Sequence, residues 1–597
     1  MLYFELQQPL SPHHIHAPDD SMTTPTRPHF SRRQFVQGLS LGGLWAAGML
    51  PSAGAWAAQR IAAQTAQIPH LYGNSFDLVI DEAWVNYTGT PRRATVVNGS
   101  LPAPTLHFVE GDTVTIRVTN RLREPTSIHW HGLLLPSHMD GVPGISFAGI
   151  LPDQSFTYQF VVQQSGTYWY HSHSGFQEQT GLMGAIIIAP RIPETAKADR
   201  EHVLLLSDWT DEDPMRLLSK LKADSGFDNY QQPTAVQLYH DIQRLGWKNA
   251  MAMRRMWNEM RMSPTDFTDL SAHTYTYLLN GQNPASNWTG LFKRGEKVRL
   301  RVINGSAQTI FDLRIPNLKL TIIASDGQPI EPVTVDEFRI GVAETYDVIV
   351  QPVDDAYTIF AQNIDRSGYA CGTLAVQAGV HAPIPTLDKI QWLTMGDMMG
   401  SMDTAMGTMA GHDMQGDMSG MAGMNPSIHA ASEQRFSNDM QVAMPRTTLS
   451  DPGINLRNNG RRVLSYADLH SIGKATEEQT SPTREIEMHL TGNMQRYIWG
   501  FDGLTFKESR PVRLAIGERV RISLVNDTMM SHPMHLHGMW SDIRNEDGDL
   551  QVRKHTFLVQ PAQKVSFDVT GIAGRWAWHC HLMYHMEAGM FREVVVD

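Results

Sequence analysis

The stretch EGDTVTIRVTN, at residues 110–120, recurs twice in the 597-residue chain, as RGEKVRLRVIN at 294–304 and as IGERVRISLVN at 516–526. The shared pattern is G-[DE]-x-V-x-[IL]-x-[VL]-x-N. Strict alternation of apolar and polar residues predicts a half-buried strand. An Asn-Gly or Asp-Gly turn precedes each copy, at Asn98, Asn280 and Asp502. The repeat therefore predicts three consecutive β-sandwich domains.

The spacing of the repeats indicates an insertion between the second and third domains. Their glycines, Gly111, Gly295 and Gly517, are 184 and then 222 residues apart. The extra residues coincide with a Met-rich segment, residues 395–424, which holds ten methionines and no apolar periodicity. We expect domains at 58–195, 196–390 and 431–597, with the insertion at 391–430.

The Met-rich segment has two readings. Because it lacks periodicity, we expect it to form no packed core. A flexible linker is one interpretation. Linkers favour serine, proline and charge, however, whereas thioether sulfur is a good ligand for the soft ion Cu(I). The composition therefore favours a role in binding soft metal ions.

The N-terminal region resembles an export leader. SRRQFVQ at 31–37 is a twin-arginine pattern, and an apolar run at 39–50 and a small-residue site at 55–57 follow it. We expect residues 1–57 to be an extension and a twin-arginine signal peptide that directs the folded chain to the periplasm. The alternative of a membrane anchor is disfavoured, because about a dozen apolar residues cannot cross a hydrocarbon core of ~30 Å.

Three further features of the sequence bear on the partners and the chemistry of the chain. Met22 would open a leader of more typical length, so HHIH at 13–16 is not expected to be a metal site. The net charge of -12 argues against nucleic acid as a partner. The chain has two cysteines, Cys371 and Cys580, and no disulfide is expected, because Cys580 is interpreted below as a metal ligand.

Four His-x-His units occupy matching places in the first and third domains. His129 and His535 each lie nine residues after the last asparagine of their repeat. Residues i and i+2 of a strand share one face, so each unit directs two imidazoles the same way. The four units predict a metal cluster of eight histidines: His129, His131, His171, His173, His535, His537, His579 and His581.

The second domain lacks these ligands. Leu313 and Ile315 stand at the positions of the first pair, and Ala361 and Asn363 at those of the second. We therefore expect the second domain to be structural. The eight histidines would then meet at the interface between the first and third domains.

A second metal site is predicted on the opposite face of the strand HCH at 579–581. Cys580 faces away from its two neighbouring histidines, and the surrounding sequence adds His532, His585 and Met590. Two histidines, a cysteine and a weak methionine are the ligands of a blue-copper electron-transfer centre. The first domain has Ser172 in place of Cys580. Only one electron-entry site is therefore expected.

The motifs HWHG, HSH, HPMHLHG and HCHLMYHMEAGM resemble the four copper motifs of the multicopper oxidases, and the match covers nearly all of the chain after the leader. Within that family the leader, the form HPMHLHGMW and the Met-rich insertion are most similar to the bacterial copper-resistance protein A group. The resemblance implies an all-β fold of three consecutive cupredoxin-like Greek-key β-sandwich or barrel domains. It also implies four copper ions.

The resemblance implies a role for each ligand. Type 1 copper would be held by His532, Cys580, His585 and Met590. Type 2 copper would be held by His129 and His535, and the type 3 pair by His131, His171, His173, His537, His579 and His581. Such a cluster reduces O2 to water with electrons from the type 1 site, which makes Cys580 catalytic.

The proton donor is open. Some relatives place a glutamate directly after the type 1 histidine, where this chain has Met586 followed by Glu587. Asp140 matches an acid near the cluster in relatives and is our candidate catalytic acid. The alternative is that Asp140 shapes a Gly-Pro turn.

Three functions are compatible with these motifs. The leading one is a periplasmic oxidase of Cu(I) with O2 as acceptor. Copper storage by the Met-rich segment and laccase-like oxidation of phenols are the alternatives. Cu(I) and O2 are the expected small partners, and the resemblance also allows contacts with other copper-resistance proteins of the periplasm or outer membrane. No membrane span is expected in the mature chain.

Overall fold

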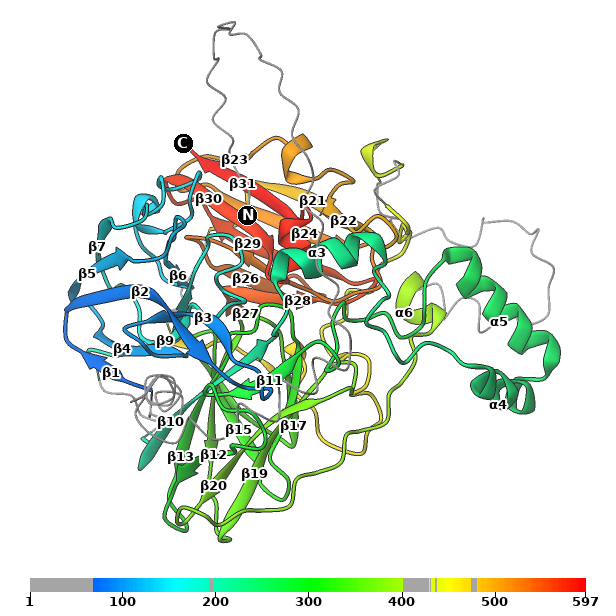
Figure 1. Cartoon of the computed structure of the whole chain (residues 1–597). Coiled ribbons are helices and arrows are strands. Elements are labelled where there is room, and N and C mark those ends of the chain that lie inside the picture. The colour runs from blue at the N-terminus through cyan, green and yellow to red at the C-terminus, as the bar shows by residue number, and fades with distance from the viewer. Residues whose placement is uncertain (1–67, 193–196, 401–428, 430, 435–437, 474–479) are drawn as a thin grey trace, which may run out of the picture. The chain divides into compact units, whose positions relative to one another are not determined.

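The computed structural model describes residues 68–192, 197–400, 429, 431–434, 438–473 and 480–597, and Figure 1 colours the chain from blue at its start to red at its end. The predicted leader, the HHIH stretch and residues 401–424 of the Met-rich segment lie outside this part. The described residues form three β-domains, each built of two sheets. This confirms the predicted fold class.

Domain 1 pairs the sheet β1-β4-β9-β8-β6 with the sheet β3-β2-β5-β7. The predicted repeat strand is β5, whose residues alternate between more and less buried positions. The strands are β1 (His70–Tyr72), β2 (Ser75–Val85), β3 (Arg92–Val97), β4 (Ala103–Val109), β5 (Thr113–Asn120), β6 (His129–His131), β7 (Ser155–Val161), β8 (Gly166–His171) and β9 (Met183–Ala189), with the short 3-10 turn η2 (Ser137–Met139).

Domain 2 pairs the sheet β11-β10-β13-β18-β15-β16 with the sheet β12-β20-β19-β14-β17. Its repeat strand is β13. The strands are β10 (Arg200–Trp209), β11 (Thr276–Leu279), β12 (Trp288–Leu291), β13 (Val298–Asn304), β14 (Phe311–Arg314), β15 (Leu320–Ser325), β16 (Gln328–Val335), β17 (Glu337–Ile340), β18 (Thr345–Val350), β19 (Ala356–Asn363) and β20 (Tyr369–Ala375).

Domain 3 repeats the topology of domain 2 strand for strand, with the sheets β22-β21-β24-β29-β26-β27 and β23-β31-β30-β25-β28. Its repeat strand is β24. The elements are β21 (Arg484–Asn493), β22 (Ile498–Phe501), η7 (Phe506–Glu508), β23 (Val512–Leu514), β24 (Arg519–Asn526), β25 (His532–Leu536), β26 (Ser541–Arg544), β27 (Leu550–Lys554), β28 (Thr556–Val559), β29 (Lys564–Thr570), β30 (Gly574–Cys580), α8 (Met583–Glu587) and β31 (Phe591–Val596).

The last asparagine of each repeat holds the same loop in all three domains. Asn120, Asn304 and Asn526 are fully buried. Each donates through Nδ2 to two carbonyl oxygens, at distances of 2.7–3.1 Å, and accepts the backbone N–H two residues later. A buried amide that satisfies its donors and acceptor fixes the chain that leads to the next strand. In domains 1 and 3 that next strand carries histidines.

The predicted turns are present in each domain. Asn98, Asn280 and Asp502 and the glycines after them all have positive φ. This is the conformation of the type I′ hairpin turn that Asn-Gly and Asp-Gly favour. The side chains of the three turn residues also accept a backbone N–H from β2, β10 and β21 of their own domains, at 2.7–2.8 Å.

The repeat strand of domain 2 is buried on both faces, contrary to the half-buried prediction. Its polar face carries Arg299 and Arg301, which pair with Asp347 at 2.5 and 3.1 Å. Thr167 of domain 1 donates to the same carboxylate at 2.6 Å. The face expected to meet water is therefore covered by domain 1, and ion pairs replace hydration.

Three helices between β10 and β11 were not predicted: α3 (Pro214–Ala223), α4 (Ala235–Leu245) and α5 (Trp247–Met260) (Figure 1). Local signals for them exist in the sequence. Asp213 caps α3 ahead of a proline, and Thr234 forms a capping box with Gln237 at the start of α4. A repeat-based comparison overlooks such signals because the other two domains have no equivalent segment.

The Met-rich segment begins inside the fold, which corrects the expectation that all of it is unpacked. Residues Met395–Met399 form the short helix α6, and Met398 is buried in a core cluster that includes residues of all three domains. Asp397 pairs with Arg457. The short 3-10 turns η4 (Ala431–Gln434) and η5 (Tyr466–Asp468) lie between α6 and β21. Within the described ranges we find no helix with the length and apolarity that a membrane span requires.

A buried lysine joins domain 3 to domain 2. The ammonium of Lys554 lies 3.2 Å from Asp326 and 3.1 Å from Glu344, and all three side chains are fully buried. Burial alone would lower the pKa of Lys554, but the charges of Asp326 and Glu344 outweigh burial and raise that pKa above its usual value. The backbone N–H groups of His555 and Thr556 also donate to Asp326. The junction therefore depends on one compensated group of charges.

Replacing Lys554 with methionine should destabilise this junction by about 3–5 kcal/mol, because two buried carboxylates lose their partner. Thermal unfolding of the purified variant measures the loss as a lower midpoint. Lys319→Met is the matched control, since Lys319 forms an exposed pair with Asp336, and it should change stability by less than about 0.5 kcal/mol. Equal midpoints for the two variants would contradict this account of the junction.

Candidate metal centre

The four His-x-His units come from equivalent strand pairs of domains 1 and 3. In domain 1, β6 and β8 place His129 opposite His171, and in domain 3, β25 and β30 place His535 opposite His579. The same register in domain 2 places Leu313 opposite Ala361. The alignment drawn from the sequence is therefore correct, and domain 2 has Leu313, Ile315, Ala361 and Asn363 where the other two domains have imidazoles.

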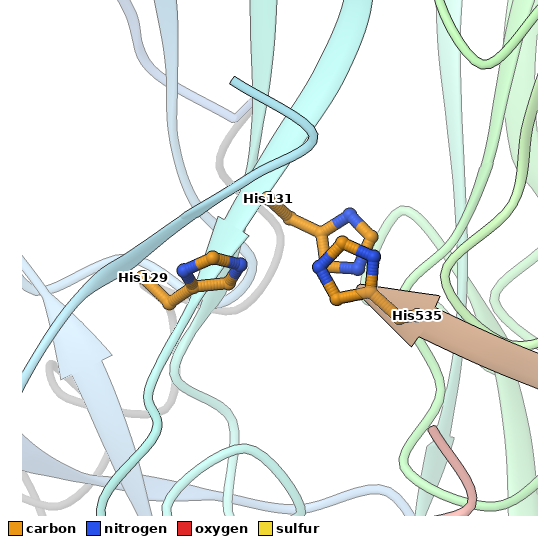
Figure 2. A group of neighbouring side chains, drawn as sticks. All are labelled: His129, His131 and His535. Atoms are coloured by element: carbon orange, nitrogen blue, oxygen red, sulfur yellow. The ribbon is translucent and has the colours of Figure 1, made fainter. Parts of the chain in front are cut away.

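The eight histidines meet at the interface of domains 1 and 3. Potential ligand atoms lie within 4.8 Å of one another in three buried groups: His129, His131 and His535; His131, His171 and His581; and His173, His537 and His579. Figure 2 shows the first group, in which the imidazoles from β6 meet the one from β25. The rings of His131 and His535 stack, with centroids 3.8 Å apart. Each group combines both domains.

The outward nitrogen of most of these rings is fixed by the protein. In four rings, Nδ1 donates to a backbone carbonyl oxygen at 2.7–3.0 Å: His129, His171, His535 and His579. Nδ1 of His537 instead lies 2.8 Å from the carboxylate of Asp140. Such hydrogen bonds orient a ligand ring and select its tautomer. They leave Nε2 to face the centre of the cluster.

The inward nitrogens fit a group of cations. Nε2 of five rings is buried without a hydrogen-bond partner among the described residues: His129, His131, His171, His535 and His581. The other three nitrogens face one another, with Nε2 of His579 at 3.1 Å from His537 and 3.3 Å from His173. A buried nitrogen that accepts no hydrogen bond destabilises the fold unless a cation binds it.

The protonation state of the rings also suits metal binding. Burial, followed by repulsion from neighbouring histidines, holds the pKa well below the usual value in His131, His171, His173, His535, His537 and His581. Burial lowers the pKa of His579 to about 4. These imidazoles are therefore neutral near pH 7, which is the form that binds a metal ion.

The opposite face of β30 carries the second group. Sγ of Cys580 lies 3.5 Å from Nδ1 of His532 and 3.9 Å from Nδ1 of His585, and all three side chains are buried. Burial raises the pKa of the Cys580 thiol. Since the thiolate is the ligand form, a cation has to stabilise it here. Met590 is buried, and its backbone bonds with Cys580 and His585.

Asp269 and Thr528 contact this second group and were missed by the sequence analysis. Asp269, from domain 2, lies 2.9 Å from Nε2 of His585. The hydroxyl of Thr528 lies 2.7 Å from Nε2 of His532. Domain 2 is thus more than a structural spacer. Thr528 could have been found by its fixed offset from Asn526, whereas nothing near Asp269 in the sequence marks its role.

Asp140 and Glu178 are the two acids at the histidine cluster. Besides its contact with His537, Asp140 has Oδ1 3.4 Å from Nδ1 of His129. Glu178 lies 2.8 Å from Nδ1 of His171 and lines a cavity of about 10 Å³, with room for roughly one water, beside His579 and His581. Asp140 was predicted, and Glu178 was missed although it closely follows the HSH motif.

Comparison with known proteins gives the same family as the motifs. Models described as multicopper oxidase match residues 79–192, 200–379 and 479–597. The chain belongs to the multicopper oxidase family. This confirms the expected resemblance and identifies the chain as an oxidoreductase that uses copper.

Two relatives are similar over almost their whole length. Copper resistance protein A of Escherichia coli is 53% identical over 607 residues, covering 95% of this chain and 99% of that protein. Copper resistance protein A of Pseudomonas syringae pv. tomato is 52% identical over 611 residues, with the same coverage. The crystal structure of Fet3p, a multicopper oxidase that functions in iron import, has a TM-score of 0.62 at 19% identity. It covers 88% of this chain and 91% of its own and shows a shared fold.

The two cysteines allow a matched test of the second group. Cys580→Ser should abolish the thiolate-to-copper absorption band while the eight histidines still bind copper, because the two ligand sets lie on opposite faces of β30. Cys371→Ser should keep the band, since Cys371 is buried in β20 and its nearest polar contact is the carbonyl of Pro284. Visible absorption and copper content measure both. A strong band in Cys580→Ser would refute the assignment.

Proposed function

We propose that this oxidase oxidises Cu(I) to Cu(II) in the periplasm, with four-electron reduction of O2 to water, and acts in copper resistance. The observation that carries the choice of substrate is the burial of His585. Its side chain is fully buried, Trp499 stacks on the ring at 3.8 Å, and Asp269 contacts its outer nitrogen. A bulky phenol has no direct access to such a ring, whereas a metal ion needs only nearby donor atoms.

The proposed roles of the ligands follow the two faces of β30. His532, Cys580, His585 and Met590 would hold type 1 copper. His129 and His535 would hold type 2 copper, and His131, His171, His173, His537, His579 and His581 the type 3 pair. The bound copper ions would supply one-electron redox chemistry. The chain's contribution is the covalent path from Cys580 to His579 and His581, on the order of 10 Å.

Asp140 and Glu178 are proposed to manage protons at the histidine cluster. Oδ2 of Asp140 orients His537, and its Oδ1 has no hydrogen-bond partner in the described part of the chain. In this proposal, Oδ1 is the oxygen that would take up and release a proton. Glu178 lines the small cavity beside the cluster. Some relatives have a glutamate directly after the type 1 histidine, where this chain has Met586. We propose that the two buried acids of domain 1 take over its role in proton supply.

The proposals for export and for substrate delivery are based on the sequence. The twin-arginine pattern at 31–37 supports export of the folded chain to the periplasm, and cell fractionation tests this location. The methionines between residues 401 and 424 would bind incoming Cu(I). The names of the relatives, copper resistance protein A, support the same role. Other copper-resistance proteins are candidate partners.

Oxygen uptake with Cu(I) beside a phenol tests the substrate. We expect rapid uptake with Cu(I) and slow uptake with the phenol, because His585 is covered. The two copper ligand sets should together hold four ions per chain in the resting enzyme. Little turnover with many bound ions would instead support copper storage, and fast turnover of the phenol would support a laccase-like oxidase.

Deleting residues 401–424 tests the Met-rich segment. The deletion should spare residues 395–400, because Met398 packs in the core and Asp397 pairs with Arg457. We expect a higher apparent KM for Cu(I) and equal or faster oxidation of a bulky organic donor. Steady-state kinetics measure both. If the segment is only a linker, the Cu(I) kinetics will not change.

Asp140→Asn separates proton supply from ring orientation. The amide oxygen of asparagine can still accept a hydrogen bond from His537, but the side chain no longer carries a proton. We expect O2 reduction to fall by roughly 100-fold or more, a typical effect of losing an acid catalyst. Anaerobic reduction of the type 1 site, followed by stopped-flow absorption, should keep its rate. An unchanged rate of O2 reduction would show that Asp140 does not supply protons and would leave it a structural role in its turn and beside His537.

A further inference from the structure

A third group of metal-binding side chains lies in domain 3, apart from both copper ligand sets. It consists of His429, Glu433 of η4, His489 of β21 and Asp527, which directly follows β24. One ligand atom from each lies within 4.8 Å of the other three. His429 is partly exposed, and the other three side chains are buried.

The four ligand atoms lie together as two hydrogen-bonded pairs with somewhat longer distances between the pairs. Nδ1 of His429 lies 2.6 Å from Glu433 and 3.4 Å from Asp527. Nδ1 of His489 lies 2.8 Å from Asp527 and 3.8 Å from Glu433. The two rings are 4.6 Å apart at their centroids. Each imidazole nitrogen therefore points at both carboxylates.

Surrounding bonds hold these side chains in place. The other oxygen of Asp527 accepts the backbone N–H of Val442 at 2.8 Å, which directs Oδ2 towards the histidines. The backbone N–H of His489 donates to the turn residue Asp502. Nε2 of His429 is buried and has no hydrogen-bond partner among the described residues. Two buried carboxylates this close repel each other unless positive charge compensates them.

We propose that His429, Glu433, His489 and Asp527 form a binding site for a divalent transition-metal cation. Two imidazoles and two carboxylates suit Cu(II) and Zn(II), whereas Cu(I) prefers thiolate and thioether ligands. Cu(II) binds most tightly in the usual order of divalent ions. Cu(II) as the natural occupant rests on the proposed function, because it would be the product of Cu(I) oxidation. The site itself does not depend on that function.

In the sequence, the four residues of the site lie between the Met-rich segment and the type 1 ligands. In sequence, His429 lies five residues after Met424, the last methionine of the segment. Asp527 precedes Thr528, whose hydroxyl contacts His532. A cation bound here would therefore be held by residues that follow the proposed Cu(I)-binding segment in sequence and precede the type 1 ligand His532. The two imidazoles and two carboxylates would bind Cu(II) more tightly than Cu(I).

The test uses the full-length copper-loaded protein, titrated with Cu(II) and, separately, with Zn(II). Bound metal is counted after desalting, and an electron paramagnetic resonance spectrum records added Cu(II). The double variant His429→Gln with Glu433→Gln should retain one divalent ion fewer than the natural chain. It should also lose a Cu(II) signal with nitrogen hyperfine structure. The control His381→Gln with Glu331→Gln changes the same residue types at exposed positions and should match the natural chain.

Equal numbers of retained ions in the double variant and the natural chain would overturn the proposal and leave only ion pairs at this place. The blue absorption band and the thermal midpoint report whether the double variant folds. If it does not fold, His429→Gln alone changes the partly exposed ligand, and a metal affinity reduced by less than tenfold would overturn the proposal. If the natural chain retains the additional divalent ion but does not oxidise Cu(I), the proposed function is refuted and this site stands.

Discussion

Neighbouring side chains of a β-strand point to opposite faces, and this constraint at the end of β30 sets the chemistry of the whole molecule. His579 and His581 join the histidine cluster on one face, and Cys580 joins His532 and His585 on the other. One strand therefore separates two ligand sets and connects them covalently. A shift of one residue in the register of β30 would exchange the two faces and abolish both sets.

The register of β30 is in turn fixed by its partner strand and by the fold of domain 3. His535 stands opposite His579 on β25. The loop that enters β25 is held by the buried amide of Asn526, as it is by Asn120 and Asn304 in the other domains. Domain 2 keeps this scaffold without a histidine at any of the four ligand positions. The scaffold and the ligands are thus separable features of the sequence.

The fold and the grouping of the eight histidines could be predicted because the strand pattern and the His-x-His units recur with a fixed spacing. A strand pattern repeated three times identifies the domains, and the nine-residue step from Asn120 to His129 and from Asn526 to His535 aligns the histidines. The absence of histidines at these positions in domain 2 then indicates which two domains supply the cluster. These inferences use only strand periodicity and comparison within one chain.

Other parts of the site depend on contacts between distant segments, which spacing does not encode. Asp269 reaches His585 from another domain. His429, His489 and Asp527 come together from three separate segments of the chain. The helices α3, α4 and α5 have local capping signals but no counterpart in the repeat. The burial of β13 likewise follows from domain 1 packing on it, which the strand pattern of domain 2 alone does not indicate.

The positions of bound copper in a crystal of the full-length oxidase test the central claim most directly. Anomalous scattering measured at the copper absorption edge locates each ion without reference to activity or colour. We expect one peak bounded by His532, Cys580 and His585, and a separate group of three peaks among the eight histidines. A Cys580 face without copper, or a copper ion that binds Cys580 together with His579 or His581, would contradict the assignment of two sites to the two faces of β30.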